Sequence, residues 1–194
     1  MLGNGLYAAG HYEEASSVIE ADLATMRRLG VTGDCILTIQ SNLANTYHQL
    51  GQPEHALRLK RDVYSGSLRL NGEENTFTFI AANNYAASLI FLRRFKEAKS
   101  LLRRTTPVAQ RVLGASAEVT LKMRFNHAKA LYKDGGAMLD DLREAVITLE
   151  ETERIARRVF GGANPLIGDI EATLRNSRAT LAARETPSPP SETV

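Results

Sequence analysis

Apolar residues recur along this chain at three- and four-residue spacing, which is typical of α-helices that bury one face. One such stripe covers residues 43–50 and ends at a Gly-Gln-Pro break at 51–53, where a turn is favoured. A second stripe of the same spacing follows from 56 to 70. Pro53 suits the first turn of a helix, because the missing N–H would have no intrahelical partner there. The pattern predicts two amphipathic helices joined by a short turn.

The helix pair recurs with a fixed period. Asn42, Asn84 and Asn126 are spaced by 42 and 42 residues, and an alanine follows two positions after each. Each alanine has a second alanine further on, at separations of 12, 12 and 17 residues. The last separation is five residues longer than the other two. The stretch 135–139, with its two adjacent glycines, is the predicted position of these five extra residues. Paired alanines predict a close crossing of two antiparallel helices, because larger side chains would separate the backbones.

Several motifs within this period resemble the tetratricopeptide repeat (TPR) family. The segment 42–51, Asn-Leu-Ala-Asn-Thr-Tyr-His-Gln-Leu-Gly, and the Tyr/Phe-x-Glu-Ala segments at 12–15 and 95–98 are similar to its helix signatures. The segments 70–76 and 160–165 are similar to the Leu-Gly-x-x-His-Pro linker of the kinesin light chain subtype. A period of 42 residues also resembles that subtype rather than the usual 34-residue repeat.

The resemblance covers about residues 1–185 and implies a right-handed superhelical α-solenoid of antiparallel helix pairs, so the predicted fold class is all-α. About four repeats and a C-terminal helix are expected. The glycine-rich start of the chain predicts that the array begins part-way through a repeat. The predicted boundaries are 1–34, 35–76, 77–118 and 119–164 for the repeats, 165–185 for the terminal helix and 186–194 for a polar, proline-rich disordered tail.

The predicted second helices share a pattern at their C-terminal ends. Arginines precede each closing step, where cations favour the negative end of the helix dipole; phosphate binding is the alternative interpretation. Gly or Asn then supplies a left-handed cap. The closing steps are Leu29–Gly30, Leu70–Asn71, Leu113–Gly114 and Phe160–Gly161. Pro107 falls inside one of these helices and predicts either a kink or an early end.

Composition narrows the class of partner and the compartment. Lys and Arg total 24 against 22 Asp and Glu, so the net charge of +2 lacks the strong basic excess of a nucleic-acid-binding protein. The single cysteine, Cys35, excludes an intramolecular disulfide and fits a reducing compartment. We find no signal peptide and no apolar run near the 20 or so residues that span a membrane. The expected location is cytoplasmic, with no nucleic acid and no membrane as partner.

The histidines, the cysteine and the glycines of this sequence are not spaced as they are in metal sites or catalytic sites. His48 and His55 fall on different helices of one pair, with no Cys, Asp or Glu at metal-ligand spacing beside them. Cys35 has no histidine at a defined spacing. A phosphate-binding glycine loop and a Gly-x-Ser-x-Gly elbow are both absent. We therefore expect no enzyme activity, no cofactor and no metal.

The remaining candidate is the exposed stripe of each first helix, which lines the concave groove in arrays of this kind. The stripe changes from neutral polar near 38–48, through apolar near 80–91, to basic and aromatic near 122–133. The predicted groove residues are Thr38, Ser41, Asn42, Asn45, His48, Asn83, Asn84, Ile90, Lys122, Phe125, Asn126, Lys129, Tyr132 and Lys133.

This gradient favours an acidic peptide with a hydrophobic anchor. The lysines would bind carboxylates, while Phe125 and Tyr132 would offer a flat apolar surface. In the alternative interpretation the aromatic residues fill the core. The recurring asparagines either hold helices in place or bond a peptide backbone, since an amide both donates and accepts.

The sequence thus predicts a non-catalytic protein–protein interaction scaffold, and the resemblance to kinesin light chains implies cargo-adaptor work. The alternative is a self-associating structural fragment of a larger multidomain protein, because a short first repeat would leave an apolar end. Nucleic-acid binding through helical repeats is a third hypothesis, against which the 42-residue period and the small net charge both argue.

Overall fold

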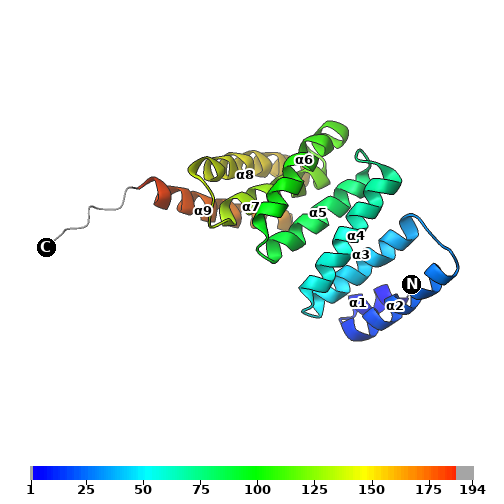
Figure 1. Cartoon of the computed structure of the whole chain (residues 1–194). Helices are drawn as coiled ribbons and strands as arrows, with labels where there is room; N and C mark the ends of the chain where they lie inside the picture. Colours follow the sequence, from blue (N-terminus) through cyan, green and yellow to red (C-terminus); the bar gives the residue numbers. More distant parts are fainter. Residues whose placement is uncertain (1, 187–194) are drawn as a thin grey trace. The chain divides into compact units, whose positions relative to one another are not determined.

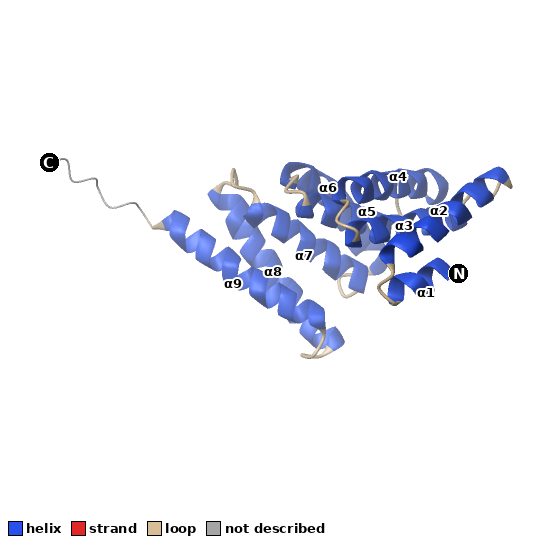
Figure 2. Ribbon diagram, turned by 90° about the horizontal axis from the view of Figure 1, so that it is seen from below, coloured by secondary structure: helices blue, strands red, loops and turns tan. Residues whose placement is uncertain are grey.

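The computed structural model describes residues 2–186, and every regular element in that range is an α-helix (Figures 1 and 2). The predicted all-α, TPR-like fold class is confirmed. The chain divides into two compact units, 1–94 and 95–194. We describe each unit by itself. The predicted disordered tail lies outside the described residues from 187 onward.

The first unit is a succession of helices, each packed on the next. Its helices are α1 (Leu2–Ala8), α2 (Tyr12–Arg28), α3 (Asp34–Gln49), α4 (Pro53–Asn71) and α5 (Thr76–Phe91). Pro53 is the first residue of α4, as expected. One core cluster joins α2 and α3 through Ile19, Leu23, Ile39 and Leu43. A second joins α3, α4 and α5.

The part of the second unit that the structure describes, residues 95–186, contains four helices. They are α6 (Phe95–Leu113), α7 (Glu118–Lys133), α8 (Leu139–Phe160) and α9 (Pro165–Glu185). Each packs on the next, and α7 also contacts α9. The core cluster is drawn from α7, α8 and α9, with Leu131, Leu149 and Ile170 completely buried.

The recurring alanines are all completely buried, which is the burial expected at close helix crossings. They are Ala15, Ala44, Ala56, Ala86, Ala98, Ala128 and Ala145, each with 0% exposure. Polar neighbours on the same helices remain partly exposed, so these positions mark the packed face of each helix.

Glycines in the left-handed region follow the second helices, as the closing steps predicted. Gly30, Gly114 and Gly161 have φ values of 71, 89 and 72°. The prediction was wrong at Asn71, which is the last residue of α4, while Gly72 adopts φ 82°. Glycine is favoured there because a side chain at positive φ clashes with the backbone.

Pro107 does not end its helix. The α6 helix continues six residues beyond it to Leu113, so the predicted early end is wrong. The proline ring is exposed, whereas Thr106 and Ala109 on either side are buried. Burial of the flanking turns therefore holds the helix through a position where one backbone hydrogen bond is lost.

The five extra residues of the last full period are divided between a turn and a helix. The α7–α8 turn at 134–138 is two residues longer than the turns at 50–52 and 92–94. The α8 helix has 22 residues where α4 and α6 have 19. The added length precedes Ala145, which remains completely buried.

Among the described residues, no helix combines the length and the apolar character that a membrane span needs.

Candidate functional site

The predicted groove residues lie on three helices in two units. Thr38, Ser41, Asn42, Asn45 and His48 belong to α3, whereas Asn83, Asn84 and Ile90 belong to α5. Lys122, Phe125, Asn126, Lys129, Tyr132 and Lys133 belong to α7 in the second unit. We therefore treat the α3–α5 set and the α7 set as separate candidate sites.

Polar side chains join α3 to α1 in the first unit. The Asn42 amide Nδ2 donates to Asn4 Oδ1 at 3.1 Å, and Gln49 Nε2 donates to Tyr7 Oη at 3.5 Å. A pocket of about 120 Å³ lies beside these contacts, and both Asn42 and Asn45 line it. Asn42 thus holds two helices together and also borders a small cavity.

An aromatic pair connects the C-terminal ends of α3 and α5. The rings of His48 and Phe91 lie edge to face, with centroids 4.7 Å apart. Phe91 is 61% exposed, which makes it the prominent apolar side chain of this face. The pKa of His48 is lowered by partial burial and by the nearby charge of Lys60. The imidazole is consequently held in its neutral form at neutral pH.

Ile90 was placed on the exposed stripe, and this is wrong. Its side chain is 6% exposed and belongs to the buried side of α5. Successive side chains on a helix point about 100° apart. When Ile90 faces the core, Phe91 therefore points outward. Thr38, Ser41, Asn83 and Asn84 are partly buried.

Charged and aromatic side chains gather where α7 faces α9. The Lys129 ammonium lies 5.4 Å from the centroid of the Phe125 ring, and Tyr132 is hydrogen-bonded to Asn176 of α9. The pKa of Lys129 is lowered first by burial and then by Lys133, while Asp169 of α9 raises it. Lys133 itself is exposed.

Lys122 is less available than the other two lysines. Its ammonium pairs with Glu118 one turn earlier on α7, at 2.6 Å. Lys129 forms no ion pair within the described range of the chain. The basic character of this face therefore rests chiefly on Lys129 and Lys133.

Phe125 does not offer the flat surface that the sequence suggested. It is 8% exposed and belongs to the core cluster of the second unit. Here the alternative interpretation, core filling, is correct, because helices pack on more than one side of α7. Asn126 is also buried, at 8% exposure, while Tyr132 remains half-buried.

Within residues 2–186, no three His, Cys, Asp or Glu side chains are grouped so as to hold a metal ion. Cys35 is exposed and forms no disulfide.

Antiparallel helix pairs, buried alanines at the crossings and left-handed glycines after the second helices define a helical-repeat protein. Residues 36–76 match the family model of the tetratricopeptide repeat. The predicted resemblance to this family is therefore confirmed for that segment and for the fold. No curated protein matches the chain in sequence.

Solved structures that resemble the chain include kinesin light chain-like repeat proteins. Two are of nearly identical TPR-like repeats from a Podosopora anserina protein described as a kinesin light chain. The first has a TM-score of 0.78 at 19% identity, covering 95% of this chain and 85% of that one. The second has a TM-score of 0.70 at 18% identity, covering 96% and 94%.

A third similar structure is BtubC (BKLC) from P. vanneervenii. Its TM-score is 0.71 at 18% identity, and the match covers 100% of this chain and 83% of that one. At this identity the likeness concerns the fold. A TPR fold is in turn a scaffold suited to protein–protein interaction.

Proposed function

We propose that this chain is a non-catalytic scaffold that binds a protein partner through an acidic peptide segment, with Lys129 and Lys133 of α7 as its main contacts. The observation that supports this is the charge arrangement of the α7 face. Lys129 and Lys133 lie one turn apart on α7, and the pKa of Lys129 is lowered first by burial and then by the positive charge of Lys133. A carboxylate between them would relieve this repulsion.

The apolar part of the ligand would rest against Tyr132. This ring is half-buried, and its hydroxyl is already bonded to Asn176, so an edge or face of the ring is the part left for a partner. Phe125 contributes indirectly, because its buried ring supports the Lys129 side chain from below. The hydrophobic anchor of the peptide would therefore contact Tyr132 and not Phe125.

The kinesin light chain-like fold favours an adaptor role in which the peptide belongs to a cargo protein. A cytoplasmic location agrees with one exposed, unpaired cysteine.

The test is fluorescence anisotropy with a labelled peptide that carries one aromatic residue between Asp and Glu residues. A matched peptide replaces the acids by Asn and Gln. We expect binding of the acidic peptide only, and its loss in Lys129→Glu. Arg104→Glu is the control, since it changes the net charge equally at an exposed residue of another helix, α6. Equal binding to Lys129→Glu and to the native chain would contradict the proposal.

A further inference from the structure

A groove runs between α2 and α4 of the first unit, with α3 as its floor. It consists of two pockets of about 470 and 450 Å³. Arg27 lines both pockets and so marks the point where they meet. None of the predicted groove residues of α3 lines either pocket. The groove is therefore a surface separate from the face considered above.

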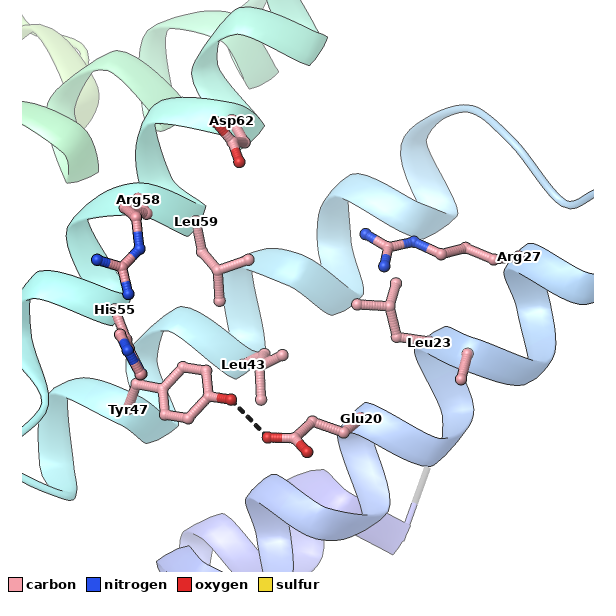
Figure 3. Close-up of a pocket in the computed structure, with 10 residues that line it drawn as sticks. Glu20, Leu23, Arg27, Leu43, Tyr47, His55, Arg58, Leu59 and Asp62 are labelled. Atoms are coloured by element: carbon pink, nitrogen blue, oxygen red, sulfur yellow. Dashed lines mark hydrogen bonds between the residues drawn. The ribbon is translucent and has the colours of Figure 1, made fainter.

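The floor of the groove is apolar at both ends. Leu23, Leu43 and Leu59 come from three different helices and line the first pocket (Figure 3). Leu23 and Leu43 are buried in the core beneath it, so the partly exposed Leu59 is the leucine that a partner would cover. In the second pocket the corresponding residues are Ile36 and Leu70, and Leu70 is 53% exposed. Apolar surface of this kind gains free energy when a partner's side chain covers it.

The rim of the groove carries uncompensated positive charge. Arg27 and Arg58 lie on opposite sides of the first pocket (Figure 3), and Arg69 borders the second. None of these three arginines forms an ion pair within residues 2–186.

The carboxylates on the same rim are already engaged. Glu20 accepts a hydrogen bond from the Tyr47 hydroxyl at 2.5 Å. Asp62 accepts two from Arg61, at 3.0 and 3.2 Å, so its charge is compensated by an arginine outside the groove. The Tyr47 hydroxyl is neutral, so Glu20 keeps its negative charge. Three arginines without an ion pair outweigh this one carboxylate, so the rim is basic and favours an acidic partner.

The spacing of the two pockets limits the partner further. Leu59 lines the first pocket and Gly66 the second, and seven residues of α4 correspond to about 10 Å along its axis. A peptide in the polyproline II conformation rises about 3.1 Å per residue with three residues per turn, so the side chains at i and i+3 lie on the same side, about 9 Å apart. Two apolar side chains at positions i and i+3 would therefore reach one pocket each, with the residues between them beside Arg27.

We propose that the α2–α4 groove binds an extended acidic peptide of the pattern apolar-acidic-acidic-apolar. The apolar side chains occupy the two pockets, and the acidic side chains pair with Arg27 and with Arg58 or Arg69. Arginine suits this task because its planar guanidinium binds a carboxylate through two parallel hydrogen bonds. The site is independent of the lysines on α7.

The test uses the whole chain and three fluorescein-labelled peptides. The first is Gly-Ser-Leu-Asp-Glu-Leu-Ser-Gly; the second replaces Asp and Glu by Asn and Gln, and the third replaces both leucines by serine. We expect the first peptide to bind at least about tenfold more tightly than either of the others, because each of them lacks one half of the recognition. Its affinity should fall as salt is added.

Variants then locate the site. Arg27→Glu should weaken binding of the first peptide by about tenfold or more, and Arg58→Glu should also weaken it. Arg28→Glu is the matched control, because Arg28 is the exposed neighbour of Arg27 on α2 and lines neither pocket. Circular dichroism establishes that each variant is folded.

Three results would overturn this proposal: no binding of the first peptide, equal binding of all three peptides, or an equal loss in Arg27→Glu and Arg28→Glu. Lys129→Glu separates it from the proposed function. That variant should leave the leucine peptide bound, and a loss there would assign the peptide to the α7 face and reject the groove.

Discussion

The Tyr47 hydroxyl of α3 donates a hydrogen bond of 2.5 Å to the Glu20 carboxylate of α2. This contact joins two helices at one end of the α2–α4 groove. The hydrogen bond, followed by burial and by the negative charge of Glu20, raises the pKa of Tyr47 to about 12. The contact between α2 and α3 therefore depends on the protonation of Tyr47, which can be followed by absorbance.

We expect Tyr47→Phe to lower the free energy of unfolding by about 1 kcal/mol, the usual contribution of one hydrogen bond. The folded pKa lies above the ordinary value of 10.0, so this stability is present below pH 10 and is lost as pH rises through 12. The titration of the Tyr47 hydroxyl is obtained by subtracting the absorbance titration of Tyr47→Phe from that of the native chain. Glu20→Gln should return its pKa toward 10, and an unchanged titration would show that Glu20 is not the cause.

Arg93 is the non-glycine residue with positive φ in the described chain, at φ 60°. Gly51, 42 residues earlier, adopts φ 70° at the equivalent turn. The left-handed region costs a residue with a Cβ about 1 kcal/mol, only part of which is offset by the greater freedom of glycine in the unfolded chain. Arg93→Gly should therefore stabilise the protein by about 0.5 kcal/mol in urea unfolding. Gly51→Ala is the reverse control and should destabilise it.

His127 gives the protein a stability that depends on pH. The ring is buried, and burial lowers its pKa below the ordinary 6.5; Glu144 and Asp141 oppose this shift, while Arg103 and Lys99 add to it. Because the folded protein resists protonation, the unfolded state gains protons first as pH falls below 6.5. Stability from this group is thus present above pH 6.5 and declines below it, toward the folded pKa.

Urea unfolding of the native chain and of His127→Gln at pH 7.5, 6.5 and 5.5 measures this effect. We expect a smaller loss on acidification in the variant. His48→Gln is the comparison, because His48 also has a lowered pKa but is only partly buried, so its removal should change the slope less. Identical slopes for the native chain and His127→Gln would contradict the prediction.

Lys99 anchors the long α7–α8 turn to α6. Its ammonium lies 3.0 Å from Asp134 and 3.5 Å from Asp141, and the three side chains are 18%, 12% and 22% exposed. We expect Lys99→Ala to cost about 1–2 kcal/mol, because it leaves two largely buried carboxylates without their cation. The exposed pair of Lys122 and Glu118 provides the control, since Lys122→Ala should cost less than about 0.5 kcal/mol.

The same ion pair has an acid limit. A hydrogen bond from Lys99, followed by one from the Gly136 N–H, lowers the pKa of Asp134 below its ordinary value of 3.8. The stability it contributes is present above pH 3.8 and is lost as pH falls through the folded pKa. Lys99→Ala should therefore raise the pKa of Asp134, which carboxyl NMR titration would detect. An unchanged pKa would mean that the backbone hydrogen bond is the dominant cause.

The helices and their crossings could be predicted from the sequence because both depend on local information. Alanines at a fixed period identified buried positions, and Gly30 and Gly161 identified helix ends. The orientation of side chains on α5 and α7 could not be predicted as well. Both helices are apolar on several sides, so periodicity does not distinguish buried Phe125 from exposed Phe91.

The α2–α4 groove was beyond sequence analysis for a different reason. Leu23, Leu43 and Leu59 each belong to an ordinary amphipathic stripe, and a pocket exists only because three helices bring them together. The positive charge of the rim could not be predicted either, because its arginines come from different helices. The sequence places Arg27 and Arg69 near helix C-termini, but it does not show the pocket that both of them border.

The divided insertion at 134–139 has a practical consequence for protein engineering. Two residues enlarge an exposed turn and three lengthen α8 upstream of Ala145, so the added length leaves the buried phase of that helix unchanged. Gly135 and Gly136 lie at the tip, exposed and with open space around Gly135, between the anchored Asp134 and the start of α8. An epitope tag or a fluorescent label spliced between these two glycines would therefore lengthen an exposed turn and leave Ala145 in its buried position.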